Sequence, residues 1–275
     1  MPTRRNVTPA KVVSVNRGVR SERPDTLATE EPMEIRVGGP DQEAAQVAVT
    51  MRTPGGDYEL AVGFLFTEGL IGPGDVRRVA YCDDLDDESQ RYNVVTVTLD
   101  RPFDAALVRR NFYATSSCGI CGKAALDDVE VRCGPVAEGP EVRAEVLIGL
   151  PDQIRAKQKV FDRTGGLHAA GLFTPGGELI SLREDVGRHN AVDKVIGEQV
   201  LAARVPLANH VLQVSGRASF EIVQKAAMAG IPIVSAVSAP SSLAVEAGER
   251  FGMTIVGFVR DGRCNVYTRA DRVLT

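Results

Sequence analysis

The stretch HVLQVSGRASFEIVQKAAMAGIPIVSA, residues 210–236, decides the fold of the second half of the chain. The apolar run His210–Val214 predicts a strand, and Ile231–Ala236 predicts another. Between them, Ala218–Gly230 has the amphipathic pattern of a helix. Strands that alternate with amphipathic helices imply a layered α/β/α arrangement.

The same alternation extends on both sides of this stretch. A helix is predicted to open at Pro151 and to close near Gly165, because proline suits the first helical turn. Further helices are predicted at Arg188–Ala203 and Ser241–Phe251. Further strands are predicted at His168–Phe173, Leu179–Leu182, Met253–Val259 and Asn265–Thr268, the first two as a hairpin. We therefore expect an α/β three-layer C-terminal domain over residues 141–275.

The first half of the chain predicts a smaller α+β domain over residues 24–110. Strands are indicated at Met33–Val37, Gln46–Arg52, Arg78–Tyr81 and Asn93–Leu99. The turn TPGGD at residues 53–57 leads into a helix, Tyr58–Ile71, which Asp57 is expected to cap. Residues 1–23 carry six basic side chains and one acidic one, and we interpret this basic N-terminal arm as a solvated tail rather than a docking arm. Residues 111–140 form a connector that holds a cysteine loop.

Composition excludes several classes of protein. The hydrophobic fraction of 44% and the charged fraction of 25% are ordinary for globular proteins. The net charge of -4 argues against nucleic-acid and membrane-surface binding. No apolar segment reaches the roughly 18 residues of a membrane span, and no signal-peptide pattern opens the chain. The five cysteines are odd in number and scattered, which indicates a reducing cytoplasm and thiols that are free, metal-bound or catalytic.

Two of those thiols lie in the loop SSCGICGK, residues 116–123. Glycines follow Cys118 and Cys121 and leave the sulfurs unshielded, and Lys123 favours the thiolate through its charge. Because the thiolate is the reactive form, we favour a catalytic pair of thiols. A structural zinc site of Cys118, Cys121, Cys133 and a distant histidine is a competing interpretation. A thioredoxin-like site is disfavoured because the preceding residues are polar, and Cys82, Cys133 and Cys264 are expected to have no catalytic part.

Three junctions between predicted strands and helices are rich in small and polar residues. They read EDVGRHN at 184–190, SGRAS at 215–219 and SAPSS at 238–242. In an open α/β sheet such junctions gather at the carboxyl ends of the strands, where Arg188 and Arg217 would favour a phosphorylated ligand. Simple helix capping is the alternative at each junction. His189 is the better histidine candidate for ligand contact or proton transfer, ahead of His168, whereas His210 is expected to be structural.

Taken together, these segments resemble the formate dehydrogenase accessory sulfurtransferase family, FdhD. The resemblance runs from TPG at 53–55 to NVYT at 265–268. Its most specific pieces are SSCGICG at 116–122, RTGGLHAA at 163–170, EDVGRHNAVDK at 184–194 and SGRAS at 215–219. Two cysteines three positions apart are weak evidence alone, but four such segments in this order are strong.

The resemblance implies an enzyme, a sulfurtransferase with a cysteine persulfide intermediate. Family members accept sulfur from a cysteine desulfurase and pass it to the metal of the bis(molybdopterin guanine dinucleotide) cofactor, which then enters formate dehydrogenase. Cys118 corresponds to the persulfide-bearing cysteine and Cys121 to its partner. Whether the client uses molybdenum or tungsten stays open, as does the role of Cys121.

The resemblance also implies a cofactor-binding segment and a homodimer. The cofactor is a bound substrate here, and GDP is its expected analogue. We expect it to contact these residues: Phe258, Val259, Arg260, Asp261, Gly262, Arg263, Arg188, His189, Gly216, Arg217 and Ser219. The C-terminal fold is expected to be similar to that of cytidine deaminases. Zinc hydrolysis is not expected, because the equivalent junctions lack the glutamate and cysteines of a zinc deaminase.

A non-catalytic cofactor chaperone is the main competing function. In that case the two cysteines would only grip metal or cofactor, and no sulfur would be transferred. A persulfide on Cys118 after incubation with a desulfurase would separate the two hypotheses.

Overall fold

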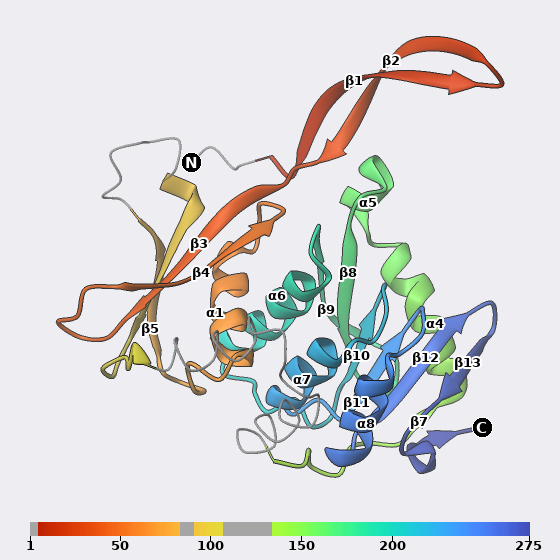
Figure 1. Cartoon of the computed structure of the whole chain (residues 1–275). Helices are drawn as coiled ribbons and strands as arrows, with labels where there is room; N and C mark the ends of the chain where they lie inside the picture. Colours follow the sequence, from red (N-terminus) through yellow and green to blue (C-terminus); the bar gives the residue numbers. More distant parts are fainter. Residues whose placement is uncertain (1–4, 83–90, 107–133) are drawn as a thin grey trace.

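A computed structural model describes residues 5–82, 91–106 and 134–275. Its central element is a six-stranded sheet with the strand order β13-β12-β11-β10-β8-β9 (Figure 1). Three neighbouring strands run parallel to one another: β10 (Val211–Val214), β11 (Ile233–Ala236) and β12 (Thr254–Arg260). The other three strands are β8 (His168–Phe173), β9 (Leu179–Asp185) and β13 (Arg263–Val266). Strand β8 is antiparallel to β10, β9 is antiparallel to β8, and β13 is antiparallel to β12.

Helices cover both faces of this sheet. Helix α4 (Ala144–Arg155) packs on one face, against a cluster that includes Val211, Ile233 and Val256. The other face carries α6 (Arg188–Leu201), α7 (Phe220–Met228) and α8 (Ser242–Arg250). Because both faces are buried, the parallel strands are apolar at most positions. The mixed α/β fold predicted from the sequence is confirmed, whereas the likeness to cytidine deaminases stays a prediction.

A second, four-stranded sheet lies beyond α1 (Asp57–Thr67) in the order β4-β3-β6-β5. Its strands are β3 (Glu31–Gly38), β4 (Ala45–Arg52), β5 (Val76–Tyr81) and β6 (Val94–Leu99). One apolar core runs from this sheet through α1 and α6 into the six-stranded sheet, so that Met33 and Leu212 belong to the same cluster. The division of the chain near residue 110 stays a prediction.

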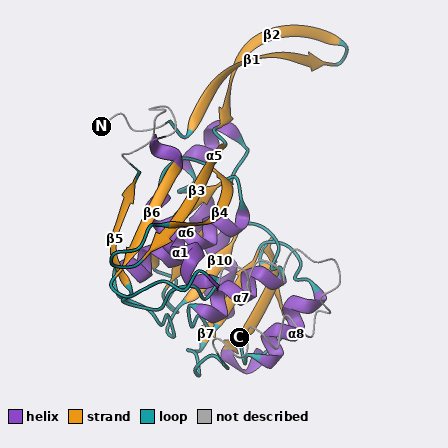
Figure 2. Cartoon of the chain, turned by 60° about the vertical axis from the view of Figure 1, so that its left-hand side comes forward, coloured by secondary structure: helices purple, strands orange, loops and turns teal. Residues whose placement is uncertain are grey.

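The N-terminal residues form an antiparallel hairpin that the sequence did not predict. Strands β1 (Val7–Asn16) and β2 (Val19–Ala28) pair along their whole length, and Figures 1 and 2 show the hairpin projecting from the rest of the chain. Arg17 and Gly18 both have positive φ, as a two-residue hairpin turn requires. The interpretation of residues 1–23 as a tail is therefore wrong for residues 7–23. Its basic charge obscured the alternation of valine with polar residues.

Two expected helix starts are also wrong. Asp57 is the first residue of α1 rather than its cap, and the N-cap is Gly56 in a left-handed conformation. Pro151 lies inside α4, which begins seven residues earlier, so the short helix α5 (Lys159–Thr164) is a separate element that ends at Gly165. The remaining short elements are η1 (Arg91–Asn93), β7 (Val142–Arg143), η2 (Ala270–Arg272) and β14 (Val273–Leu274). Within the described ranges, no helix has the length and apolar character that crossing a membrane requires.

Candidate functional site

The carboxyl ends of the parallel strands meet at one edge of the six-stranded sheet. Ser215 follows β10, Val237 follows β11, and Val259 and Arg260 close β12. His168, the first residue of β8, reaches the same edge because β8 is antiparallel to β10. An edge of this kind is where open α/β sheets bind their ligands.

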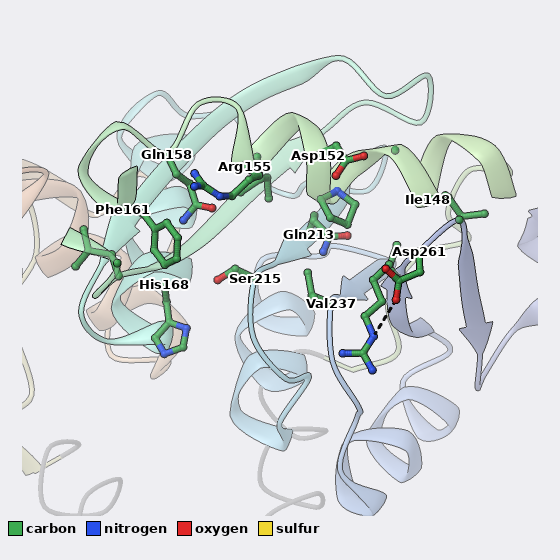
Figure 3. Close-up of a pocket in the computed structure, with 18 of the residues that line it drawn as sticks. Ile148, Asp152, Arg155, Gln158, Phe161, His168, Gln213, Ser215, Val237 and Asp261 are labelled. Atoms are coloured by element: carbon green, nitrogen blue, oxygen red, sulfur yellow. Dashed lines mark ion pairs between the residues drawn. The ribbon is translucent and has the colours of Figure 1, made fainter. Parts of the chain in front are cut away.

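A cavity of about 900 Å³ opens at this edge, beneath α4 and α5 (Figure 3). Its floor is formed by residues at the carboxyl ends of the strands, among them Gln213, Ser215 and Val237. Its opposite wall is formed by Arg155 of α4 and Phe161 of α5. This volume lies within the range of about 300–1,000 Å³ that is typical of small-molecule and cofactor sites. The cavity is therefore large enough for a nucleotide.

Gln213 leaves an unpaired acceptor at the floor of this cavity. Its side chain is fully buried, and its Nε2 donates to the carbonyl oxygen of Val214 at 2.9 Å. That bond fixes the orientation of the amide, so the atom without a partner among the described residues is the acceptor Oε1. A buried, unpaired acceptor costs stability, and a ligand with an N–H group would satisfy it.

His168 lines the same cavity, and its surroundings favour the neutral form of the imidazole. Burial lowers the pKa of His168, and the guanidinium of Arg188 lowers it further, while Asp185 opposes the shift. A Cβ on Gly216 would lie 3.6 Å from His168 Nδ1, so the SGRAS junction lies directly beside the imidazole. The neutral ring can therefore offer a donor and an acceptor to a ligand.

The segment FVRDGR brings part of the predicted cofactor-binding set into the cavity. Val259, Arg260, Asp261 and Gly262 line it, whereas Phe258 and Arg263 are not among the lining residues. Asp261 and Gly262 both have positive φ and form the two-residue turn between β12 and β13. Phe258 also has positive φ, beside an irregularity in the β12–β13 pairing, and such irregularities re-aim neighbouring side chains. Arg260, half-exposed, presents a cation at the rim.

The predicted residues at the starts of α6 and α7 form a second group outside the cavity lining. His189 Nε2 lies 3.9 Å from Glu221 Oε2 and has no hydrogen-bond partner among the residues described. Burial lowers the pKa of His189 and Arg188 lowers it further, while Glu221 opposes the shift. The positive charge of Arg188 thus lowers the pKa of both His168 and His189. Arg217 is exposed and Ser219 is the N-cap of α7.

The acidic residues of the EDVGRHNAVDK motif are structural. Asp185 is fully buried and lies 2.6 Å from Lys194 Nζ, and it also accepts hydrogen bonds from the backbone of Thr53 and Gly187. Lys194 in turn donates to the carbonyl oxygen of Thr53 at 2.9 Å. These bonds join the TPGG turn to the start of α6. Glu184 accepts from two backbone N–H groups at the start of α5.

Asp193 has a similar structural role at the other end of the motif. Burial raises the pKa of Asp193 to about 6, although Lys225 and Thr67 oppose the shift. Its carboxylate lies 3.0 Å from Lys225 Nζ and accepts from the Thr67 hydroxyl at 2.8 Å. The pair connects α6, α7 and α1 in the buried interior, so it is not a candidate for ligand contact.

The predicted catalytic residues, Cys118 and Cys121, lie outside the described residues, as do Lys123 and Cys133 of the competing zinc site. Cys82 and Cys264 are half-buried free thiols, and burial raises the pKa of Cys264, which disfavours its thiolate. Within the described ranges, no group of three or more His, Cys, Asp and Glu side chains is arranged to hold a metal.

Sequence reasoning missed several residues of the cavity. Arg155 and Phe161 lie on α4 and α5, which the sequence divided incorrectly, and Arg155 lies over the Phe161 ring at 4.8 Å from the ring centroid. Gln213 carried a usable signal, a long polar side chain in the middle of an apolar strand. The sequence ranked His189 above His168, but His168 is the histidine that lines the cavity.

A model of the FdhD/NarQ family matches residues 28–274. The chain is 54% identical over 271 residues to a Streptomyces coelicolor protein named Sulfur carrier protein FdhD, covering 96% of this chain and 94% of the relative. It is 53% identical to the Mycobacterium tuberculosis protein of the same name, covering 91% and 92%. A crystal structure from Desulfotalea psychrophila, assigned as a formate dehydrogenase accessory protein, is similar with a TM-score of 0.74 and 25% identity, covering 98% of this chain and all of that one.

Proposed function

The chain belongs to the FdhD/NarQ family, and from this premise we propose that it is a sulfurtransferase that serves formate dehydrogenase. It takes persulfide sulfur from a cysteine desulfurase and passes it to the molybdenum, or tungsten, of the bis(molybdopterin guanine dinucleotide) cofactor. The names of the curated relatives support the sulfur-carrier role. A reducing cytoplasm would keep the required thiols in their reduced form. We propose that the protein works as a homodimer.

In the first step, the Cys118 thiolate attacks the outer sulfur of the donor persulfide. The sulfur–sulfur bond of the donor breaks, the donor cysteine leaves as a thiolate, and the outer sulfur with its proton is now bonded to Cys118. No oxidant or reductant is consumed. Lys123 favours this step because a nearby cation stabilises the attacking thiolate.

In the second step, Cys121 releases the carried sulfur. Its thiolate attacks the inner sulfur of the Cys118 persulfide, so a Cys118–Cys121 disulfide forms and the outer sulfur departs as hydrosulfide. The two electrons that reduce the sulfur come from the two cysteines. A thiol reductant then restores both thiols for the next cycle.

The observation that supports cofactor binding is the unpaired Oε1 of Gln213 in the cavity beside Val259–Gly262. Guanine carries N–H groups on its ring and on its exocyclic amine, so it matches an acceptor at a buried floor. The guanidinium groups of Arg155 and Arg260 at the cavity suit the phosphates of the dinucleotide. The residues present therefore fit a guanine nucleotide.

The proposal is tested with Cys118→Ala in a strain that lacks its own copy of the protein. We expect formate dehydrogenase activity to be lost, while the purified variant binds GDP with unchanged affinity. Cys264→Ala is the matched control, because that thiol is half-buried and has no part in the transfer. Activity retained in Cys118→Ala would contradict the assignment of Cys118.

The alternative is a non-catalytic cofactor chaperone that uses the same cavity. It predicts that GDP binding matters for formate dehydrogenase while a persulfide never forms. Gln213→Leu, which keeps the thiols and weakens GDP binding, would lower formate dehydrogenase activity under either proposal. The two proposals are separated by whether Cys118 carries a persulfide after exposure to a desulfurase.

A further inference from the structure

The hairpin of residues 7–28, the β1–β2 arm, exposes apolar side chains far from the core. Val13, Val15 and Val19 are 51%, 63% and 70% exposed, and β2 contacts the rest of the chain at α5 (Figure 2). Val13 and Val15 are two residues apart on β1, so they lie on one face of the ribbon, together with their cross-strand partners Glu22 and Arg20. An isolated two-stranded hairpin is only marginally stable in water, so this face is suited to being covered.

A second exposed apolar strip lies on β4. Val49 and Met51 are 57% and 48% exposed, and they stand opposite Glu34 and Pro32 on β3. The neighbouring pairs on these strands include the buried Met33 and Ile35, which face α1. The β4 strip of Val49 and Met51 is therefore on the outer face of the four-stranded sheet, and β4 is its edge strand.

The charges around these two surfaces are complementary. Residues 5–28 carry five basic and two acidic side chains, and Arg17 and Arg20 lie exposed at the tip of the arm. Residues 29–44 carry five acidic side chains and one basic one. Asp41 and Glu43 are exposed just before β4, and Glu30 is exposed near its other end. Opposite charges of this kind select a partner and orient it.

We propose that the β1–β2 arm of one copy of this chain docks on the β4 strip of a second copy, and that the second arm does the same in return. The contact is then isologous and closes with two-fold symmetry. Ten-residue strands are about 33 Å long, enough to span the eight residues of β4. The proposal rests on the homodimer of the proposed function and assigns it a surface.

Two charge variants test this surface by analytical ultracentrifugation. Val15→Asp places a carboxylate beside Val13 on the face of the arm that carries both valines, opposite Arg20, which makes a favourable cross-strand pair. Val49→Lys places a cation on the β4 strip, opposite Glu34, for the same reason. We expect the wild type to sediment as a dimer and each variant alone to dissociate at least ten times more readily.

An equimolar mixture of the two variants should restore the dimer. One contact in the mixed dimer then joins two unaltered surfaces, and the other joins the carboxylate introduced on the arm to the cation introduced on the β4 strip. If Val15→Asp disrupts the hairpin, Val15→Thr replaces it, because threonine has a high strand propensity. We expect Val15→Thr to weaken the dimer less than Val15→Asp does. Circular dichroism confirms that each variant is folded.

Each outcome decides the proposal. Variants that stay dimeric, or a mixture that stays monomeric, would overturn the docking surface while leaving the homodimer intact. A Val49→Lys variant that stays dimeric while Val15→Asp dissociates would show that the arm contacts a different surface. A monomeric wild type would overturn the homodimer and the surface together, without bearing on sulfur transfer by Cys118.

Discussion

Gly63 of α1 and Gly197 of α6 meet where the two helices cross, and neither position has room for a side chain. A Cβ on Gly63 would lie 1.9 Å from the backbone oxygen of Asp193, and a Cβ on Gly197 would lie 1.8 Å from that of Glu59. The backbones of the helices are therefore in direct contact. This crossing fixes the N-terminal sheet relative to the start of α6, where Asn190 donates to the Met51 carbonyl oxygen at 2.8 Å.

Replacing Gly197 with alanine should therefore force α1 and α6 apart. Overpacking in a filled interior costs about 1–3 kcal/mol and occasionally more, and we expect the upper end because the clash is with backbone. Urea denaturation measures the loss. Gly149→Ala is the control, because a Cβ at that position in α4 would meet nothing within 4 Å. A loss for Gly197→Ala no larger than for Gly149→Ala would contradict the described crossing.

Removing the cation of the buried Asp185–Lys194 pair should be strongly destabilising. Lys194→Met leaves the Asp185 carboxylate buried without a counter-charge, which costs about 3–5 kcal/mol. Arg101→Ala removes the cation of a more exposed pair with Asp75, 2.6 Å apart, and should cost less than about 1 kcal/mol. Thermal and urea unfolding of both variants provide the comparison. Similar losses in the two variants would refute the structural role of Asp185.

Gln213→Leu should weaken GDP binding while the protein stays folded. One hydrogen bond to a neutral acceptor contributes about 0.5–1.5 kcal/mol, so the dissociation constant should rise roughly two- to tenfold by isothermal titration calorimetry. Ser235→Ala is the matched control. Ser235 pairs with Gln213 across β10 and β11, and its buried hydroxyl has no hydrogen-bond partner in the described part of the chain, but it does not line the cavity. An equal effect from both variants would argue against a direct contact between GDP and Gln213.

Stability should fall as the pH drops below 6.5. Burial lowers the pKa of His168, His189 and His210 from the ordinary value of 6.5. The folded chain then binds fewer protons than the unfolded chain in this window, so acid favours unfolding. The raised pKa of Asp193, about 6, acts in the opposite direction.

The matched variant carries His168→Gln, His189→Gln and His210→Gln. Asp193 is present in both proteins, so its contribution cancels when the free energy of unfolding of the variant is subtracted from that of the wild type. Chemical denaturation between pH 7.5 and pH 5 should show a steeper decline for the wild type on the acid side. Parallel curves for the two proteins would mean that the histidines keep their ordinary pKa values in the folded state.

Much of the fold follows from local pattern. The run from His210 to Ala236 gave two strands and the helix between them, because apolar strands and amphipathic helices leave different periodicities. The division between α4 and α5 was missed because Pro151 is tolerated inside α4, against its usual preference for a helix start. The β1–β2 arm was missed because its alternation of valine with polar residues is interrupted and its charge favours a tail.

The candidate site depended on contacts between distant segments. Sequence indicated the junctions at Arg188 and Arg217 and the FVRDGR segment, each from its own residues. It could not show that His168, rather than His189, shares a cavity with Val259–Gly262, because that follows from the antiparallel direction of β8. Asp185 and Asp193 of EDVGRHNAVDK resembled site residues in the sequence, but in the structure both are buried and paired with Lys194 and Lys225.

The most direct test of the account is the mass of the chain after incubation with a cysteine desulfurase and cysteine. In a Cys121→Ala variant, which cannot release the sulfur by forming a disulfide, we predict an added mass of roughly 32 Da, one sulfur atom, located on Cys118 by peptide mapping. The Cys118→Ala variant should gain none. Sulfur that never appears on Cys118, or that appears on Cys82 or Cys264 instead, would contradict the proposed sulfur transfer.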